Sequence, residues 1–172
     1  HEDALSVKEA ELATLRRIGA AEESILGAQN NLANTYQHLG RLEQALRMRQ
    51  DTYSRQLKLN GAQDPYTITA AICYASNLNA LQHHAQAKTL TRKTMPVARR
   101  VLGESHELTL RVSCNFAEAL YEDPDATLDD IREAVTMLED TAPTARRVLG
   151  GAHPLTADIE RYLRLARDAL RA

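Results

Sequence analysis

One six-residue phrase, Ala-Arg-Arg-Val-Leu-Gly, occurs twice in this chain, at 98–103 and again at 145–150. Each copy is followed by a histidine, His106 or His153, and then by a Leu-Thr pair. A duplication of this length is very improbable by chance in 172 residues. It predicts an array of similar structural units, and such arrays are typical of binding scaffolds rather than of catalysts.

Small residues recur with one period along the chain. Glycines at 19, 61, 103 and 150 are separated by 42, 42 and 47 positions. The same register relates three further columns: Ala33, Ala75 and Ala117; Ala45, Ala87 and Ala134; Thr52, Thr94 and Thr141. The five additional residues of the last unit fall between Ala117 and Ala134, and the segment near 121–126, with Pro124, is the predicted insertion.

Composition and periodicity predict an all-α fold. Apolar residues make up 44% of the chain, which suffices for a continuous core, while glycine and proline number only seven and five. No stretch alternates convincingly over the length of a strand. Within the first unit, Ile25, Leu32 and Tyr36 form one apolar stripe at helical spacing, and Gly40 is positioned to end that helix.

Capping residues mark where helices begin. Asp64 and His153 each precede a proline, and proline at the first helical position loses no needed hydrogen bond. His106 occupies the same place without a proline. The acidic stretch 122–130 is expected to be a solvated insertion that caps a long helix starting at Asp125.

Charge and motif content exclude several classes of function. A net charge of −2 argues against a dedicated nucleic-acid binder. The sequence contains no run of 18 apolar residues, so no membrane span is predicted. Two cysteines, Cys73 and Cys114, indicate a reducing compartment and a cytoplasmic location, and both are expected to be inert thiols. No paired carboxylates, nucleophile triad, phosphate loop or metal constellation is recognisable, so we expect neither an enzyme nor a cofactor or metal. The adjacent His83 and His84 point in different directions on a helix and make a poor metal pair.

The first unit resembles a tetratricopeptide repeat. It reads Asn-Leu-Ala at 31–33, then Tyr36, then Leu-Gly-Arg at 39–41 and Glu-Gln-Ala-Leu at 43–46. The period is 42 rather than the common value of about 34, and long repeats ending in Leu-Gly before His-Pro or Asp-Pro are similar to those of kinesin light chains. The family's usual tryptophan is replaced by Gln29, Ala71 and Ser113, and prolines at 96 and 143 are expected to kink two second helices.

This resemblance implies a right-handed superhelical α-solenoid of antiparallel helix pairs, with about seven or eight helices in a single domain. We expect a truncated or capping helix at 1–18, repeats at 19–60, 61–102 and 103–149, and a terminal helix at 150–172.

The resemblance also implies a protein-interaction scaffold whose first helices line a concave groove that holds an extended peptide. Side-chain amides can form hydrogen bonds with a peptide backbone, and the arginines can form ion pairs with acidic groups of the peptide. The positions expected to face the groove are Asn30, Asn34, His38, Thr69, Ser76, Asn79, Arg111, Glu118, Tyr121 and Arg161, with Asp158 beside the last.

Self-association is the alternative function, because a repeat array exposes an apolar face at each end unless it is capped. A homodimer could then form through the terminal helices. The apolar residues expected to pair are Leu5, Leu12 and Leu15 near the start, and Leu155, Tyr162 and Leu170 near the end.

Overall fold

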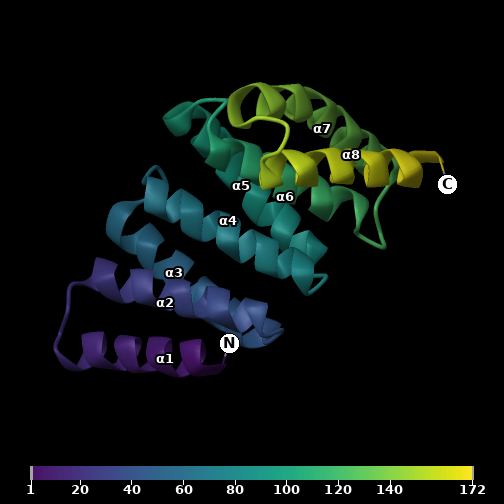
Figure 1. The fold of residues 1–172 in the computed structure, drawn as a ribbon. Helices are drawn as coiled ribbons and strands as arrows, with labels where there is room; N and C mark the ends of the chain where they lie inside the picture. The colour runs from purple at the N-terminus through teal and green to yellow at the C-terminus, as the bar shows by residue number, and fades with distance from the viewer. Residues whose placement is uncertain (1, 172) are drawn as a thin grey trace. The chain divides into compact units, whose positions relative to one another are not determined.

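The computed structural model describes residues 2–171, with side chains from residue 4 onward, and every regular element in that range is an α-helix (Figure 1). The prediction of an all-α fold is therefore confirmed. The eight described helices are α1 (Glu2–Arg17), α2 (Glu22–His38), α3 (Leu42–Asn60), α4 (Pro65–Ala80), α5 (His84–Leu102), α6 (Glu107–Tyr121), α7 (Leu128–Leu149) and α8 (Pro154–Arg171).

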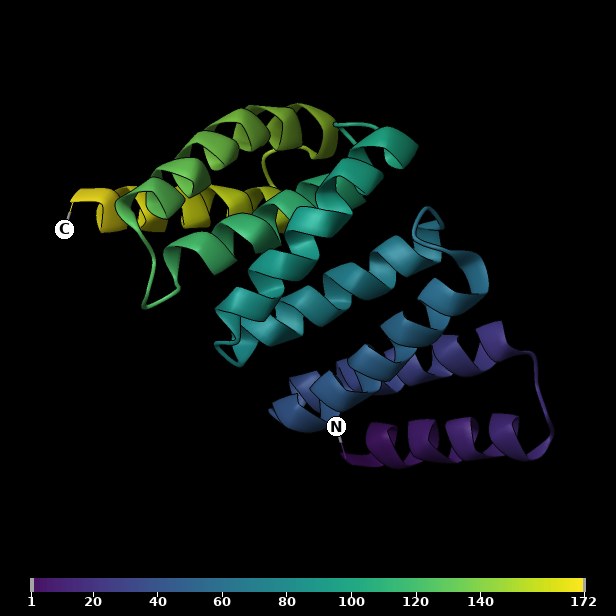
Figure 2. The same cartoon turned by 180° about the vertical axis from the view of Figure 1, so that it is seen from behind.

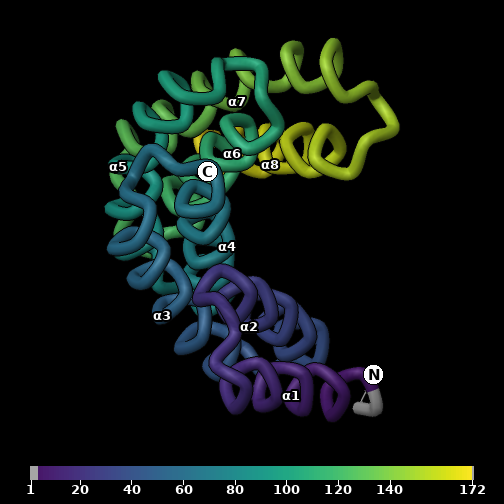
Figure 3. The backbone as a smooth tube through the Cα atoms, turned by 90° about the vertical axis from the view of Figure 1, so that its left-hand side faces the viewer, coloured from purple at the N-terminus to yellow at the C-terminus, as the bar shows by residue number. Residues whose placement is uncertain are grey.

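The chain divides into two compact units, residues 1–81 and 82–172. The division falls inside the predicted second repeat, between its two helices. In the N-terminal unit α1, α2, α3 and α4 pack in chain order, and successive helices run in opposite directions (Figure 2). In the C-terminal unit α8 packs against both α6 and α7 (Figure 3).

Fully buried alanines lie on the packed helices of each unit. Ala33 of α2 and Ala45 of α3 have no exposed surface and belong to one apolar cluster with Leu12 and Leu32. In the other unit Ala117 and Ala134 are equally buried. Because a methyl group is the smallest side chain that still excludes water, helices can approach closely at these positions.

Side-chain caps start the helices where the sequence predicted them. Asp64 accepts hydrogen bonds from the backbone N–H groups of Tyr66 (2.9 Å) and Thr67 (3.1 Å). His106 and His153 each accept one through Nδ1, at 3.2 Å. These bonds satisfy donors that have no partner within the helix, so the expected capping roles are confirmed.

The start of α7 differs from the expectation. The helix begins at Leu128 rather than at Asp125, because Thr127 and Asp130 form a reciprocal capping box. Asp130 also pairs with Lys88 of α5. The helices that contain Pro96 and Pro143 continue through both prolines, which are exposed.

Two turns share one backbone conformation although only one contains glycine. Gly40 has φ 72°, and Gln82, which is 42 residues later, has φ 59°. The residues that follow them, Arg41 and His83, have φ and ψ of −85° and 61°, and −84° and 52°. Left-handed backbone costs a residue with a Cβ about 1–2 kcal/mol, so Gln82 keeps the turn at an energetic cost.

We predict that Gln82→Gly raises the free energy of unfolding by about 1 kcal/mol, because glycine adopts this φ without strain. Gly40→Ala should lower it by a similar amount, since nothing lies within 4 Å of an added Cβ and the cost is conformational alone. Urea unfolding measures both changes. Gln86→Gly, an exposed position inside α5, is the control and should destabilise by about 1 kcal/mol; a Gln82→Gly variant that behaves like this control would contradict the interpretation.

Asp130 should make the C-terminal unit sensitive to acid. Hydrogen bonds from Lys88 and Thr127 lower the pKa of Asp130 from 3.8 to about 2, and its side chain is 18% exposed. Because the pKa is depressed in the folded state, the stabilisation is complete above the unfolded value and is lost as pH falls from about 4 to about 2.

Asp130→Asn should therefore cost about 1–2 kcal/mol at pH 7 and reduce the loss of stability between pH 5 and pH 2. Asp129→Asn is the matched control, because Asp129 is 90% exposed. Urea unfolding across this pH range is the measurement, and equal acid profiles for the wild type and Asp130→Asn would refute the role of Asp130.

Candidate functional site

The predicted groove residues lie on the helices expected to carry them, six in the N-terminal unit and four in the C-terminal unit. Ser76 is half-buried and His38 is exposed. Asn79 is 3% exposed, so the prediction that it faces outward is wrong: this position of α4 belongs to the buried side of the helix. The placements are Asn30, Asn34 and His38 on α2; Thr69, Ser76 and Asn79 on α4; Arg111, Glu118 and Tyr121 on α6; and Arg161 on α8.

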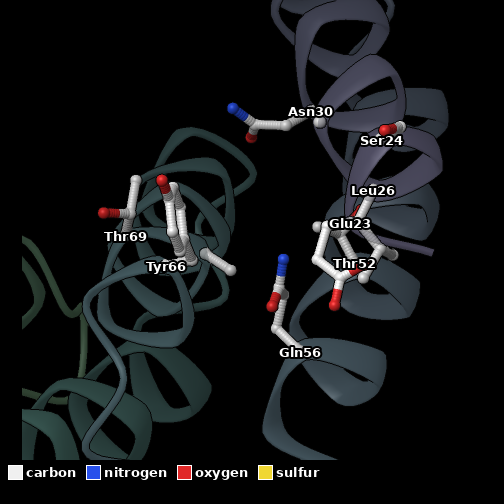
Figure 4. A pocket seen from close by; sticks show the side chains of 10 residues that line it. Glu23, Ser24, Leu26, Asn30, Thr52, Gln56, Tyr66 and Thr69 are labelled. Carbon is white, nitrogen blue, oxygen red and sulfur yellow. The ribbon is translucent and has the colours of Figure 1, made fainter. Parts of the chain in front are cut away.

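A cavity of about 410 Å³ in the N-terminal unit brings two of these residues together (Figure 4). Its walls come from α2 and α4, the first helices of two repeats, and from α3 between them. Asn30 and Thr69 are the predicted residues that line it. The side chains used below are Glu23, Leu26 and Asn30 from α2, Thr52 and Gln56 from α3, and Tyr66 and Thr69 from α4.

Two amides give the cavity its hydrogen-bonding capacity. Oε1 of Gln56 accepts a hydrogen bond from Nδ2 of Asn60 at 2.8 Å, which fixes the orientation of the Gln56 amide. Its nitrogen points into the space between Asn30 and Tyr66 (Figure 4). The amide of Asn30 extends into the same space from α2. The donor groups of Gln56 and the amide of Asn30 are thus available to a ligand.

The hydroxyl groups at the cavity differ in what they can do. Thr69 donates its hydroxyl hydrogen bond to the carbonyl of Pro65 at 2.8 Å, and its oxygen points away from the cavity (Figure 4). Thr94 and Thr141 each bond the carbonyl four residues earlier, at 2.9 Å and 2.7 Å. Thr52 stands in the same column, is buried, and has no hydrogen-bond partner among the described residues. All three threonines of this column are therefore buried, but only Thr94 and Thr141 form a side-chain hydrogen bond to the preceding helical turn.

Five of the seven cavity residues named above, Glu23 and Leu26 among them, were not predicted as site residues. Thr52 and Gln56 belong to a second helix, whereas the resemblance directed attention to first helices. Tyr66 follows the Asp64-Pro65 cap and is 71% exposed. An exposed aromatic residue directly after a helix cap is the signal that could have identified it, because large apolar side chains are usually at least partly buried.

Asn34 does not point a free amide outward, as was expected. Its Oδ1 accepts a hydrogen bond from Nη2 of Arg49 at 2.9 Å. The same guanidinium donates to Oε1 of Gln37 and to the backbone carbonyl of Cys73, both at 2.5 Å. Arg49 is only 4% exposed, and burial lowers its pKa. Its partners on α2 and α4 are neutral, so Asn34 helps to hold a buried cation between three helices.

Three of the four predicted residues of the C-terminal unit, Glu118, Tyr121 and Arg161, contact Tyr162 of α8. Glu118 of α6 accepts a hydrogen bond from the hydroxyl of Tyr162 of α8 at 3.1 Å. The rings of Tyr121 and Tyr162 lie 6.1 Å apart, and the guanidinium of Arg161 lies 4.5 Å from the centre of the Tyr162 ring. Burial and the nearby carboxylates raise the pKa of both tyrosines, so their hydroxyl groups stay protonated donors.

Both predicted arginines have acidic partners within the protein. Nη2 of Arg111 lies 2.8 Å from a carboxylate oxygen of Glu107, and Nη2 of Arg161 lies 3.2 Å from Asp158. An acidic peptide group would have to compete with these pairs. The polar network of α6 and α8 therefore serves the protein's own packing, and the cavity of the N-terminal unit is the better candidate site.

The terminal leucines expected to pair between chains are largely enclosed. Leu5, Leu12 and Leu155 are buried, and Leu15 packs against the cluster that contains Leu12. Tyr162 and Leu170 are half-buried. Leu5, Leu12 and Leu155 are therefore enclosed within their own unit, and pairing between chains through Leu15, Tyr162 and Leu170 stays a prediction.

Cys114 is buried, and burial raises the pKa of its thiol. Cys73 is half-buried. Across the part of the chain that the structure describes, no group of three or more His, Cys, Asp or Glu side chains could hold a metal ion. Within the same range no helix is both long and apolar enough to cross a membrane.

Comparison with known proteins agrees with this architecture. The tetratricopeptide repeat family matches residues 25–66, a segment that runs from α2 through α3 to the start of α4. Two solved structures of a putative kinesin light chain from Podosopora anserina, with nearly identical TPR-like repeats, share the fold. One is 20% identical with a TM-score of 0.80, covering 98% of this chain and 77% of that chain. The other is 21% identical with a TM-score of 0.76, covering 98% and 78%.

BtubC (BKLC) from P. vanneervenii is a further structural neighbour, with 14% identity and a TM-score of 0.74 over 99% of this chain and 70% of that chain. Curated protein sequences give no match. These findings define a helical-repeat protein built from antiparallel helix pairs. Residues 25–66 are similar to the tetratricopeptide repeat family, and the fold is similar to that of kinesin light chain-like repeat proteins.

Arg49 offers a test of how α2, α3 and α4 are held together. Arg49→Ala should lower the free energy of unfolding by about 3 kcal/mol, because it leaves three buried acceptors without their donor and opens a cavity. Arg47→Ala, an exposed position on α3, should change it by less than about 0.5 kcal/mol. Urea unfolding distinguishes them, and similar losses for both variants would show that the buried guanidinium does not hold the helices.

Proposed function

We propose that this protein is an interaction scaffold that binds an extended peptide segment of a partner protein, and that the cavity between α2, α3 and α4 is the principal contact. The observation that carries the proposal is that amides from two helices, Asn30 and Gln56, converge with apolar wall atoms in one cavity of about 410 Å³. Tetratricopeptide repeats are a protein-interaction fold, which agrees with this use.

The chemistry of the cavity suits a peptide better than a charged metabolite. An amide offers both a donor and an acceptor, which match the carbonyl and N–H groups of a peptide backbone. Leu26 and Ala70 add apolar wall for a side chain. A volume of about 410 Å³ lies within the range of about 300–1,000 Å³ usual for ligand sites.

The proposed contact also follows the repeat architecture. Because α3 packs against both α2 and α4, the first helices of two consecutive repeats present Asn30 and Thr69 to one space. A peptide lying across α2 and α4 would touch both residues. We assign Thr69 a wall contact rather than a hydrogen bond, since its hydroxyl already bonds Pro65.

A random library of twelve-residue peptides, screened against the full chain, tests the proposal. Asn30→Ala and Gln56→Ala should each weaken the selected peptides by about 1 kcal/mol, roughly five- to tenfold in Kd, because each removes one hydrogen-bonding amide. Fluorescence anisotropy gives the affinities.

Asn31→Ala is the matched control, since Asn31 is exposed on the same helix and lies outside the cavity lining. It should leave the affinity unchanged. Peptides that bind all three variants as they bind the wild type would place the interaction elsewhere, and a library without binders would end the proposal.

A further inference from the structure

We infer that the cavity between α2, α3 and α4 accepts a basic side chain, arginine or lysine, of the bound peptide. This inference rests on the proposed function and adds the chemical class of the residue that is recognised. It is carried by the placement of one carboxylate, Glu23, and one exposed aromatic ring, Tyr66, at the same cavity.

Charge at the cavity has a single sign. Glu23 is the only charged side chain among the lining residues. Its neighbour Glu22 pairs with Arg55, so this arginine of α3 already has a partner. Among the described residues Glu23 forms no ion pair and is exposed. A cation in the cavity would therefore gain a carboxylate partner without displacing one from the protein.

Tyr66 supplies a second group that favours a cation. The ring stands across the cavity from Glu23 and Gln56 (Figure 4). Its backbone N–H is held by the Asp64 cap at 2.9 Å, which fixes where the side chain leaves α4. The face of an aromatic ring attracts a guanidinium or ammonium group, and the protein uses the same contact between Arg161 and Tyr162 at 4.5 Å.

The remaining polar groups are compatible with a long basic side chain. The carbonyl oxygen of Asn30 can accept a hydrogen bond from the cation. The Gln56 nitrogen can donate to a backbone carbonyl of the same peptide. Leu26 offers apolar wall for the methylene groups of the basic residue.

An acidic peptide residue is the competing occupant, since α2 and α4 both begin near the cavity and a helix N-terminus favours negative charge. Each of these N-termini already has an acidic residue: Glu22 and Glu23 lie in the first turn of α2, and Asp64 caps α4. No lysine or arginine lines the cavity. Charge complementarity therefore favours the basic residue.

A positional-scanning library of twelve-residue peptides, applied to the full chain, tests the inference. We expect enrichment of arginine or lysine at one position of the selected peptides. Replacing that residue by citrulline or norleucine, which are uncharged, should weaken binding about threefold to tenfold. Glu23→Gln should weaken the basic peptide about threefold and leave the uncharged peptide unchanged.

Two further variants separate charge from folding. Glu43→Gln is the matched control, because Glu43 is also the second residue of its helix, is exposed and does not line the cavity. It should have no effect. Tyr66→Phe should keep the affinity for the basic peptide, whereas Tyr66→Ala should lower it about threefold. Thermal unfolding monitored by circular dichroism verifies that each variant is folded.

The outcomes distinguish this inference from the proposed function. If selected peptides carry acidic residues, or no preferred charge, and Asn30→Ala still weakens them, the peptide site stands and the basic side chain is refuted. If Glu23→Gln and Glu43→Gln act alike on the basic peptide, Glu23 is not its partner and the inference fails. If no peptide binds, both are overturned.

Discussion

The whole arrangement depends on helices approaching closely at alanine. A single long hairpin cannot cover its own apolar face, so within each unit the helices pack against their neighbours, and the distance of approach is set by the smallest residues at the contact. Ala33, Ala45, Ala117 and Ala134 have no exposed surface because they occupy these contacts. The 42-residue period places alanine at the same position of successive units. Because the side chain at this position has the same small volume each time, the helix packing is also repeated.

Close packing of α3 between α2 and α4 also creates the candidate site. The apolar faces of the helices are buried in the core, so the polar residues beside them lie at the boundaries between helices. Some of these polar residues form hydrogen bonds between helices: Arg49 links α2 and α4 through Asn34 and the Cys73 carbonyl, and Gln29 bonds Asp51 at 2.9 Å. Others, such as Asn30 and Gln56, stay turned toward a cavity. The position of a polar residue along its helix thus decides whether it bonds a neighbouring helix, as Asn34 does, or lines the cavity, as Asn30 does.

The sequence alone predicted the helices, the repeat columns and the histidine and aspartate caps, because these depend on periodicity and on local hydrogen bonds. It named Asn30 and Thr69, which line the cavity of the N-terminal unit, but it also placed Asn34 and Asn79 facing outward, whereas Asn34 bonds Arg49 and Asn79 is buried. Periodicity indicates which side of a helix is apolar, but it does not reveal that a buried arginine on the next helix needs an acceptor. Nor could it show that Arg111 and Arg161 would be paired within the protein, since Glu107 and Asp158 are ordinary surface residues in one dimension. Gln56 needed the packing of three helices to be recognised.

The most direct test of this account is the free energy of unfolding of Ala45→Leu compared with Gln50→Leu on the same helix. Ala45 is fully buried, whereas Gln50 is exposed. If close approach at alanine holds the helices, Ala45→Leu should lower the free energy of unfolding by about 1–3 kcal/mol, and Gln50→Leu should change it by less than about 0.5 kcal/mol. Equal and small effects of the two substitutions in urea unfolding would show that the helices do not depend on that contact, and the account would be wrong.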